Sequence, residues 1–398
     1  MRDPAFWWTE HSTAATLLAP IGAAYGAIAA RRMTRQGRKA PVPVICVGNF
    51  TLGGAGKTPT AIALARLLLA AGHRPFFLSR GYGGRVAGPV RIDQLHPAFR
   101  ASLWPPAAAS STTAPGQAAE SARQPDSTPT PDPSLPGEEE KAGGTTTCGY
   151  LARDGGSGDL GDEPLLLARV APAIVARDRL AGAKAAVEGG ADTIIMDDGL
   201  QNPSLHKDLA IAVLDGRRGI GNGRPFPAGP LRATLEAQFN HIDAVLVVGA
   251  AGRAAQYAME IARRRGAPVL HGDLHPAPEA VANLAGKPVL AFAGIADPDK
   301  FFATLEAHGI PAMVRKRFPD HHRYAADEIS DLLACAQRHS LTPVTTEKDL
   351  ARLSRDPAAV ELIARSAALP VTLRFREARA VEAMLRAAIH RHGVAAAG

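Results

Sequence analysis

The amino-acid sequence predicts an α/β protein with more than one domain, and three observations support this. An apolar run at residues 42–47 leads into a glycine-rich loop and then a helical pattern of apolar residues. Short apolar runs alternate with helical stretches over most of the remaining chain, which is typical of parallel sheets. The chain has 398 residues, of which 46% are apolar, so it is long and apolar enough for two or three packed cores.

The loop after the first strand has the composition of a phosphate-binding P-loop. It consists of Thr51, Leu52, Gly53, Gly54, Ala55, Gly56, Lys57 and Thr58. Small residues let backbone N–H groups surround a phosphate, and the following helix adds its positive N-terminal end. Lys57 is expected to reach the β- and γ-phosphates of a nucleotide, and Thr58 to bind Mg²⁺. The strict pattern has glycine where this chain has Thr51, so a glycine-rich turn that binds nothing is the alternative.

A second motif lies at the end of another apolar strand, residues 191–196, which leads into Asp197, Asp198 and Gly199. Parallel strands end at one edge of a sheet, so this acidic end is expected beside the P-loop, where Asp197 holds Mg²⁺ directly or through water. Together the two motifs predict a P-loop NTPase-type α/β/α sandwich. A second, smaller α/β domain is expected to follow it.

The expected domain organisation has three parts. Residues 1–40 form an N-terminal membrane-associated helix, residues 41–270 the P-loop domain, and residues 271–398 the C-terminal α/β domain. From about residue 103 to residue 160 the chain is dominated by Ala, Ser, Thr, Pro and Gly and carries the acidic run Glu138–Glu140. Such a segment does not bury enough apolar surface to offset the entropy of ordering, so we expect a disordered insertion without a catalytic role.

The N-terminal segment has the features of a membrane interface. Residues 12–30 carry no charge, Trp7 and Trp8 precede them, and basic residues follow them, namely Arg31, Arg32, Arg35, Arg38 and Lys39. Aromatic residues at one edge and basic residues at the other favour a helix that lies on or dips into an anionic membrane surface. An amphipathic helix packed on the protein's own core is the alternative. A secretory signal is disfavoured because the positive charges follow the apolar run.

Composition narrows the remaining function classes. The net charge of +7 is consistent with an anionic lipid, nucleotide or phosphorylated partner. No arginine-rich tract is interleaved with aromatic residues, which are only 5% of the chain, so a nucleic-acid groove is not expected. The three cysteines, Cys46, Cys148 and Cys335, are far apart, which argues against a disulfide framework and fits a reducing compartment.

Three other stretches contain candidate site residues. Arg80 lies in a glycine-rich loop after the strand expected at residues 74–78, where a phosphate contact competes with a plain surface position. The loop at residues 215–232 is long, glycine-rich and basic, which suggests a substrate-facing lid. Asp162 and Glu163 begin an expected helix, where a helix-capping role is favoured over that of a general base on local grounds.

Taken together, the motifs resemble one family, the tetraacyldisaccharide 4′-kinases (lipid A 4′-kinases). The matching stretches are residues 47–59 (VGNFTLGGAGKTP), 79–84 (SRGYGG), 161–168 (GDEPLLLA), 197–201 (DDGLQ), 221–224 (GNGR), 227–232 (PAGPLR), 292–295 (FAGI), 318–322 (FPDHH) and 346–349 (TEKD). The resemblance implies transfer of the γ-phosphate of ATP, with Mg²⁺, to the 4′-hydroxyl of a tetraacylated glucosamine disaccharide 1-phosphate, forming lipid IVA. It also implies a membrane-associated N-terminal helix, the cytoplasmic face of a bacterial inner membrane, and an active site between two α/β/α domains.

The resemblance further implies roles for individual residues. Lys57 and Thr58 match the Walker A pair, and Asp197 and Asp198 the acidic metal-binding pair. Asp162 matches the general base and His321 its histidine partner, which replaces the capping role for Asp162. Arg232 is a candidate substrate contact.

The sequence departs from the family pattern at two positions. Asn202 stands where the family commonly has histidine, and Ala233 where it commonly has glutamate. Outside the family, the sequence also fits a membrane-associated P-loop ATPase that acts as a ParA/MinD-like switch.

Overall fold

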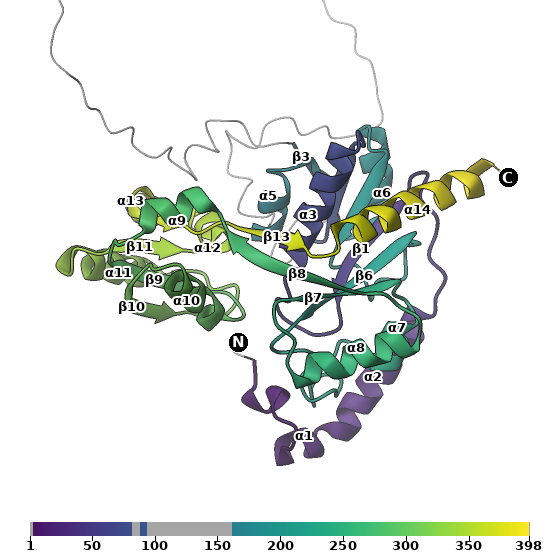
Figure 1. Cartoon of the computed structure of the whole chain (residues 1–398), viewed down its shortest axis with the longest axis horizontal. Coiled ribbons are helices and arrows are strands. Elements are labelled where there is room, and N and C mark those ends of the chain that lie inside the picture. Colours follow the sequence, from purple (N-terminus) through teal and green to yellow (C-terminus); the bar gives the residue numbers. More distant parts are fainter. Residues whose placement is uncertain (1–2, 82–87, 94–160, 398) are drawn as a thin grey trace, which may run out of the picture.

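The computed structural model describes residues 3–81, 88–93 and 161–397. The insertion expected at about residues 103–160 therefore lies outside the described residues. Two α/β units are present, and each is built on its own mainly parallel sheet (Figure 1).

The larger sheet has nine strands in the order β13-β8-β7-β6-β1-β5-β2-β4-β3. Its strands are β1 (Val44–Asn49), β2 (Pro75–Ser79), β3 (Val90–Ile92), β4 (Ala173–Val175), β5 (Thr193–Asp197), β6 (Leu209–Asp215), β7 (Ala244–Val248), β8 (Val269–Pro276) and β13 (Val371–Phe375). The seven strands from β8 to β4 run parallel, whereas β3 and β13 pair antiparallel with their neighbours. The predicted α/β fold is confirmed, and β1 lies at its centre.

Helices cover both faces of this sheet, as an α/β/α sandwich requires. Alternate residues of β1 face opposite cores: Ile45 and Val47 pack in one, and Val44 and Cys46 in the other. The first core also contains residues of α3 (Lys57–Ala70), α5 (Asp162–Leu167) and α14 (Ala378–Ala397). The second contains residues of α6 (Arg179–Glu188), α7 (Leu235–Phe239) and α8 (Arg253–Arg264).

The smaller sheet has four parallel strands in the order β10-β9-β11-β12. They are β9 (Val289–Ala293), β10 (Ala312–Arg317), β11 (Thr342–Thr345) and β12 (Ala367–Ala368). The accompanying helices are α9 (Pro278–Leu284), α10 (Pro298–Ala307), α11 (Ala326–Arg338), α12 (Glu347–Leu353), η3 (Pro357–Ala359) and α13 (Val360–Arg365). Two apolar clusters, one on each face, make the core of this unit.

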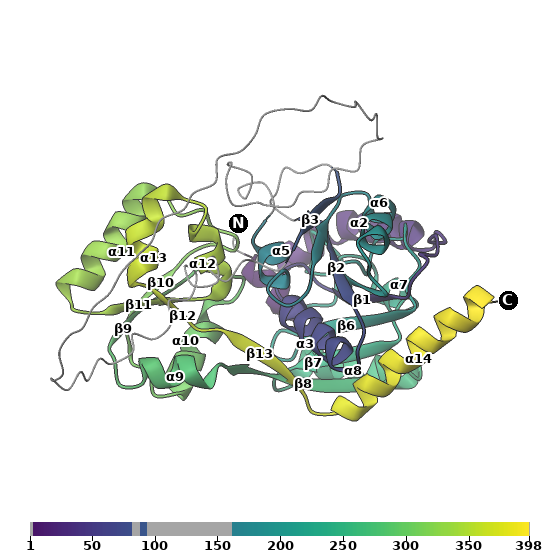
Figure 2. The same cartoon turned by 90° about the horizontal axis from the view of Figure 1, so that it is seen from above.

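The expected boundary between the domains needs a correction. A C-terminal domain of residues 271–398 would begin inside β8, which is a strand of the larger sheet. Moreover β13 pairs with β8, and α14 packs on the larger unit, so the chain returns to its first domain (Figure 2). Only the segment between β8 and β13 builds the smaller unit. Antiparallel pairing with β8 fixes this return, and no local sequence signal reports such long-range pairing.

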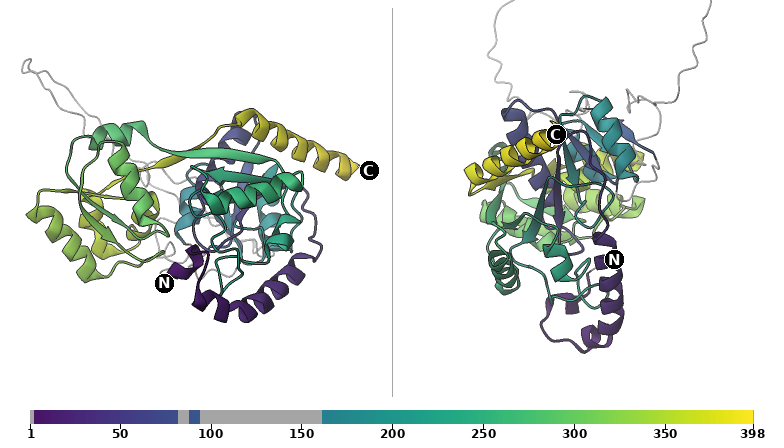
Figure 3. Two further views of the ribbon diagram at one scale, coloured as in Figure 1. Left: turned by 60° about the horizontal axis from the view of Figure 1, so that its bottom comes forward. Right: turned by 90° about the vertical axis from the view of Figure 1, so that its right-hand side faces the viewer.

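The N-terminal segment packs one face on the protein and exposes the other. It comprises η1 (Ala5–Trp8), α1 (Thr13–Leu17) and α2 (Ala19–Met33), which lie along one side of the larger unit (Figure 3). The side chains of Leu17, Ile21 and Ile28 are 80%, 59% and 72% exposed. No helix in the described part of the chain is both long enough and apolar enough to cross a bilayer.

The N-terminal segment packs on the loop between β6 and α7. The Trp7 indole N–H donates to the carbonyl of Pro227 at 3.0 Å, and the backbone N–H of Asn222 donates to the Trp7 carbonyl at 2.8 Å. Gly22 and Gly26 lie so close to Pro225 that a Cβ atom at either position would come within 2.8 Å of it. The middle of this loop is therefore not a free lid, because it is packed beneath the N-terminal helices, whereas Asp215 and Arg232 at its ends line the cleft described below.

Candidate functional site

A cleft of about 1190 Å³ lies between the two units and contains most of the predicted site. The larger unit lines it with the P-loop, the ends of β5 and β6, and α5. The smaller unit lines it with residues near α10, α12 and the loop after β10. Parallel strands place the loops at their carboxyl ends on one edge of the sheet, which is why these distant motifs meet here.

The P-loop has the backbone conformation that its glycines predict. Gly53 and Gly56 have φ values of 93° and 91°, in the left-handed region that glycine adopts without a steric penalty. The helix α3 begins at Lys57 directly after Gly56, so its free N–H groups point into the cleft. Gly53, Gly54, Gly56, Lys57 and Thr58 line the cleft. Thr51 and Ala55 are buried behind them.

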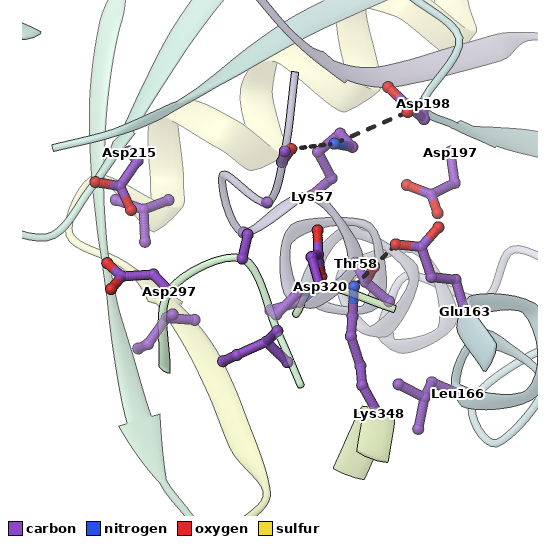
Figure 4. Close-up of a pocket in the computed structure, with 18 of the residues that line it drawn as sticks. Lys57, Thr58, Glu163, Leu166, Asp197, Asp198, Asp215, Asp297, Asp320 and Lys348 are labelled. Atoms are coloured by element: carbon purple, nitrogen blue, oxygen red, sulfur yellow. Dashed lines mark hydrogen bonds and ion pairs between the residues drawn. The ribbon is translucent and has the colours of Figure 1, made fainter. Parts of the chain in front are cut away.

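Lys57 is 8% exposed and is held between the P-loop and the acidic pair (Figure 4). Its ammonium donates to the carbonyl of Gly53 at 3.2 Å and lies 3.8 Å from Asp198. Burial lowers the pKa of Lys57, and the nearby carboxylates, with Asp198 the strongest, oppose that effect. A buried ammonium beside a glycine-rich loop at a helix N-terminus is suited to a phosphate.

The acidic pair at the end of β5 has two different environments. Asp197 is 2% exposed, and its Oδ1 atom has no hydrogen-bond partner in the part of the chain that the structure describes. Burial, with Glu163 and Asp198 nearby, raises the pKa of Asp197 to about 7. A buried carboxylate oxygen without a donor is suited to a cation, and with the Thr58 hydroxyl it forms a set of oxygen ligands of the kind Mg²⁺ prefers. The residues present therefore fit the metal.

Asp198 directly follows β5 and is oriented by Arg232. It has a φ of 53°, which is unusual for a residue with a side chain. Arg232 donates to both of its carboxylate oxygens, at 2.8 and 2.9 Å, and also to the Thr51 carbonyl at 2.9 Å. Burial opposes ionisation of Asp198, but Lys57 and Arg232 outweigh it and lower its pKa to about 2. Arg232 thus links the P-loop to the acidic pair, and it lines the cleft as a substrate contact would. Arg80 is exposed at the rim of the same cleft.

Asp162 and His321 come from the two different units and meet at the cleft. The Nδ1 atom of His321 lies 3.7 Å from Oδ1 of Asp162. The carboxylate of Asp162 is 5% exposed, whereas the His321 side chain is 34% exposed and lines the cleft. Asp162 lies in the first turn of α5, and its two carboxylate oxygens face Arg352 and His321.

The sequence analysis gave no role to two charged residues at this junction, Lys348 and Arg352. Arg352 donates to Oδ2 of Asp162 at 2.6 Å, and Lys348 lies 2.8 Å from Glu163. Lys348 and Arg352 are one helical turn apart on α12, so both reach α5. The signal was present in the TEKD stretch at residues 346–349, which resembles the family but to which no role was given.

These charged neighbours shift the pKa values of Asp162 and His321. Burial would raise the pKa of Asp162, but His321 and Arg352 outweigh it and hold that pKa well below its usual range. The Asp162 carboxylate in turn raises the pKa of His321. The carboxylates of Glu163 and Asp162 likewise outweigh burial and raise the pKa of Lys348. The cleft therefore joins the glycine-rich loop to a buried carboxylate that is paired with an imidazole and a guanidinium.

The two departures from the family pattern lie outside the described lining of this cleft. Asn202 accepts hydrogen bonds from the backbone N–H and the hydroxyl of Ser204, at 2.9 and 2.6 Å, and so closes a turn. Ala233 is fully buried, and its carbonyl accepts from Gln238 at 3.0 Å. Neither substitution removes a group from the described cleft wall.

Comparison with known proteins gives consistent matches over nearly the whole chain. The family model described as tetraacyldisaccharide-1-P 4′-kinase matches residues 14–101 and 143–390. The chain is 50% identical to a tetraacyldisaccharide 4′-kinase from Methylobacterium nodulans over 97% of this chain and 95% of that protein. It is 44% identical to one from Rhodopseudomonas palustris, covering 96% and 94%. The crystal structure of LpxK from Aquifex aeolicus in complex with ATP has a similar fold, with a TM-score of 0.62 at 22% identity, covering 94% of this chain and 99% of that one.

Proposed function

The chain belongs to the tetraacyldisaccharide-1-P 4′-kinase family, and on that premise we propose that it transfers the γ-phosphate of ATP to the 4′-hydroxyl of a tetraacylated glucosamine disaccharide 1-phosphate. The product is the lipid A precursor lipid IVA. The observation that supports this best is that one cleft contains the P-loop, the acidic pair and the Asp162–His321 pair. The first two bind a nucleoside triphosphate, and the third handles a hydroxyl proton.

The roles of the residues follow from their positions. The backbone N–H groups from Gly53 to Thr58 and the Lys57 ammonium surround the β- and γ-phosphates. Thr58, Asp197 and Asp198 are the residues that hold Mg²⁺. The metal supplies positive charge to the phosphates when bound. Asp162 and His321 form the acid–base pair, and Arg80 and Arg232 face the sugar phosphate acceptor.

A glycolipid acceptor would also account for the exposed aliphatic side chains on α1 and α2. Leu17, Ile21 and Ile28 project from α1 and α2, and the chain after α2 is basic from Arg35 to Lys39. Such a surface binds the interface of an anionic membrane without crossing it. We therefore place the enzyme at the cytoplasmic face of a bacterial inner membrane. There its acceptor reaches the cleft from the lipid side.

The decisive experiment separates a lipid kinase from an ATPase switch. The protein is incubated with ATP labelled in the γ-phosphate and with the disaccharide 1-phosphate lipid, and the lipids are then resolved by chromatography. We expect label in a more polar lipid, and none with the Lys57→Met variant. Label released as free phosphate, without labelled lipid, would support the ParA/MinD-like alternative.

A further inference from the structure

We propose that Arg218 is a positioning residue that joins the start of the N-terminal segment to the smaller unit beside the P-loop. Its guanidinium fixes the loop at residues 294–297, which connects β9 to α10. The rate of the reaction therefore depends on how the N-terminal segment is packed, apart from any contact of that segment with a membrane. This inference rests on the proposed kinase activity and assigns that activity a further residue.

The partners of Arg218 come from both units. Its Nη1 atom donates to Oδ2 of Asp3, just before η1, at 3.0 Å, and its Nη2 atom donates to the Ala296 carbonyl at 3.1 Å. Its Nε atom lies 3.8 Å from Oδ2 of Asp297. The guanidinium also lies over the Trp8 ring, 4.7 Å from the ring centroid, which is a cation–π distance. One side chain thus connects the N-terminal segment to the loop before α10.

The backbone of Arg218 is fixed to the larger unit. Strand β6 ends at Asp215, whose Oδ1 atom accepts from the Arg218 backbone N–H at 2.9 Å. The next residue, Gly219, has a φ of 55°, and a Cβ atom there would lie 2.4 Å from the backbone nitrogen of Ala255 in α8. The chain is therefore held on both sides of Arg218, so its guanidinium extends from a fixed point on the larger sheet.

Two partners of Arg218 lie directly against the P-loop. A Cβ atom at Gly53 would lie 3.8 Å from Oδ2 of Asp3 and 3.9 Å from Cβ of Ala296, and one at Gly54 would lie 3.7 Å from Cβ of Ala296. These are ordinary van der Waals distances. Asp3 and Ala296 line the cleft, whereas Arg218 is not part of its described lining. Arg218 therefore acts through these groups and not by touching the reacting atoms.

The arrangement requires an arginine. The acceptors from Asp3, Ala296 and Asp297 lie around one planar group, and a lysine ammonium lacks the fork that reaches several acceptors at fixed angles. The side chains of Asp3 and Asp297 are only 24% and 13% exposed, so their pairing is not that of free surface charges. Asp297 also pairs with Arg217, but that side chain is 63% exposed and contributes little.

The loop at residues 294–297 also determines where the catalytic side of the smaller unit lies. The Gly294 carbonyl accepts from the backbone N–H of His321 at 3.1 Å, so movement of this loop moves the histidine relative to the P-loop. Lys300 of α10 adds a second link to the larger unit, 3.3 Å from Asp215. A displacement of about 1 Å at a reacting group costs up to about a hundredfold in rate, so this alignment matters for kcat.

The first test compares kcat in the lipid-labelling assay for the wild-type protein, Arg218→Lys and Arg218→Gln. We expect both variants to lose roughly tenfold or more, because neither side chain holds all the acceptors. The matched control is Arg253→Gln, which removes the pair of an 87% exposed arginine with Glu10 of the same N-terminal segment and should leave kcat as it is. Wild-type kcat in either Arg218 variant would overturn the positioning role.

The second test distinguishes coupling through Arg218 from a general loss of stability. Asp3→Asn should lower kcat about threefold to tenfold in the wild-type background and have no further effect in the Arg218→Gln background, because residues in contact are coupled. Destabilisation alone gives factors that multiply. The same loss from Asp3→Asn in both backgrounds would therefore contradict the proposal.

The third test does not depend on activity. Amide hydrogen exchange at residues 294–297, followed by mass spectrometry, reports how firmly this loop is held. Exchange there should be faster in Arg218→Gln and in Asp3→Asn than in the wild-type protein, and unchanged in Arg253→Gln. Wild-type exchange in Arg218→Gln would refute the proposal. If the wild-type protein labels no lipid, the proposed function fails while this measurement still tests Arg218, which keeps the two failures distinct.

Discussion

Arg232 shows how a single side chain connects two motifs that are far apart in the sequence. The arginine reaches the acidic pair through two charge-assisted bonds to Asp198 and the P-loop through the Thr51 carbonyl. Asp198 has a positive φ, so its side-chain direction depends on this arginine as well as on the strand. The residue that the resemblance marks as a substrate contact thus also orders Asp198, the carboxylate that we propose as a metal ligand.

Replacing Arg232 with glutamine should therefore impair catalysis more than stability. Hydrogen bonds to charged groups contribute about 1.5–3 kcal/mol each, and if the equivalent of one such bond is lost in the transition state kcat should fall roughly tenfold to a hundredfold. The Mg²⁺ concentration that gives half-maximal rate should rise. Steady-state kinetics with a Mg²⁺ titration would measure both. Arg217→Gln is a control at a 63% exposed side chain of the same loop, and an unchanged Mg²⁺ requirement in Arg232→Gln would contradict the prediction.

At the scale of elements, α2 is held by close backbone packing on one face. Gly22 and Gly26 let the helix approach the loop at Pro225, and larger residues at these positions would collide with it. The other face exposes aliphatic side chains that this contact leaves in solvent. One face of α2 is therefore packed on the protein itself, as the second alternative of the sequence analysis expected, while membrane binding by the other face stays a proposal.

Gly26→Val should loosen α2 from the loop. Its Cβ would lie 2.8 Å from Cγ of Pro225, and overpacking of this kind costs about 1–3 kcal/mol. Thermal unfolding and limited proteolysis near residue 35 would detect the change. Ala24→Val, on the exposed side of the same helix, is the matched control and should have little effect. Equal stability of the two variants would show that this contact is not tight.

The exposed face can be tested separately from the packed one. A variant with Leu17, Ile21 and Ile28 changed to serine should bind anionic vesicles at least about tenfold more weakly, because each buried aliphatic side chain contributes about 1.5–3 kcal/mol. Its melting temperature should stay near that of the wild-type protein, since these side chains make little contact with the fold. Vesicle sedimentation measures the binding. Unchanged sedimentation would remove the membrane role of this face.

At the scale of the whole molecule, the active site depends on contacts between the two units. Asp162, Glu163 and Arg169 at α5 pair with Arg352, Lys348 and Glu347 at α12. Three ion pairs therefore join the helix that carries Asp162 to the smaller unit. The segment that precedes α5 is absent from the family model between residues 101 and 143.

Deleting residues 103–142 and closing the gap with a short Gly-Ser link should preserve kinase activity within a few-fold. The composition of this segment does not support a packed core, and long insertions cost little in loop-closure entropy. The lipid-labelling assay measures the outcome. A soluble, folded deletion variant without activity would show that the insertion has a role in the reaction.

Local patterns in the sequence were sufficient for most elements of the fold. The strands β1, β2 and β5 and the helix α3 were all expected, because apolar runs and helical periodicity report burial locally. The P-loop and the acidic pair were expected to be neighbours, since strands of a parallel sheet end at one edge. Strands β8, β11 and β12 were not expected. Strand β8 is only partly buried along its length, and β12 has two residues.

Only the tertiary structure decided what depends on contacts between distant segments. The amino-acid sequence by itself determined the α/β class, the nucleotide loop and the family resemblance, because each is encoded in short contiguous stretches. The return of β13 to the first sheet, the burial of one face of α2 and the placement of Arg352 against Asp162 each join residues many positions apart. Their physical cause is the packing of two sheets and the desolvation of charges between them. Packing and desolvation belong to the folded molecule and to no single stretch of its sequence.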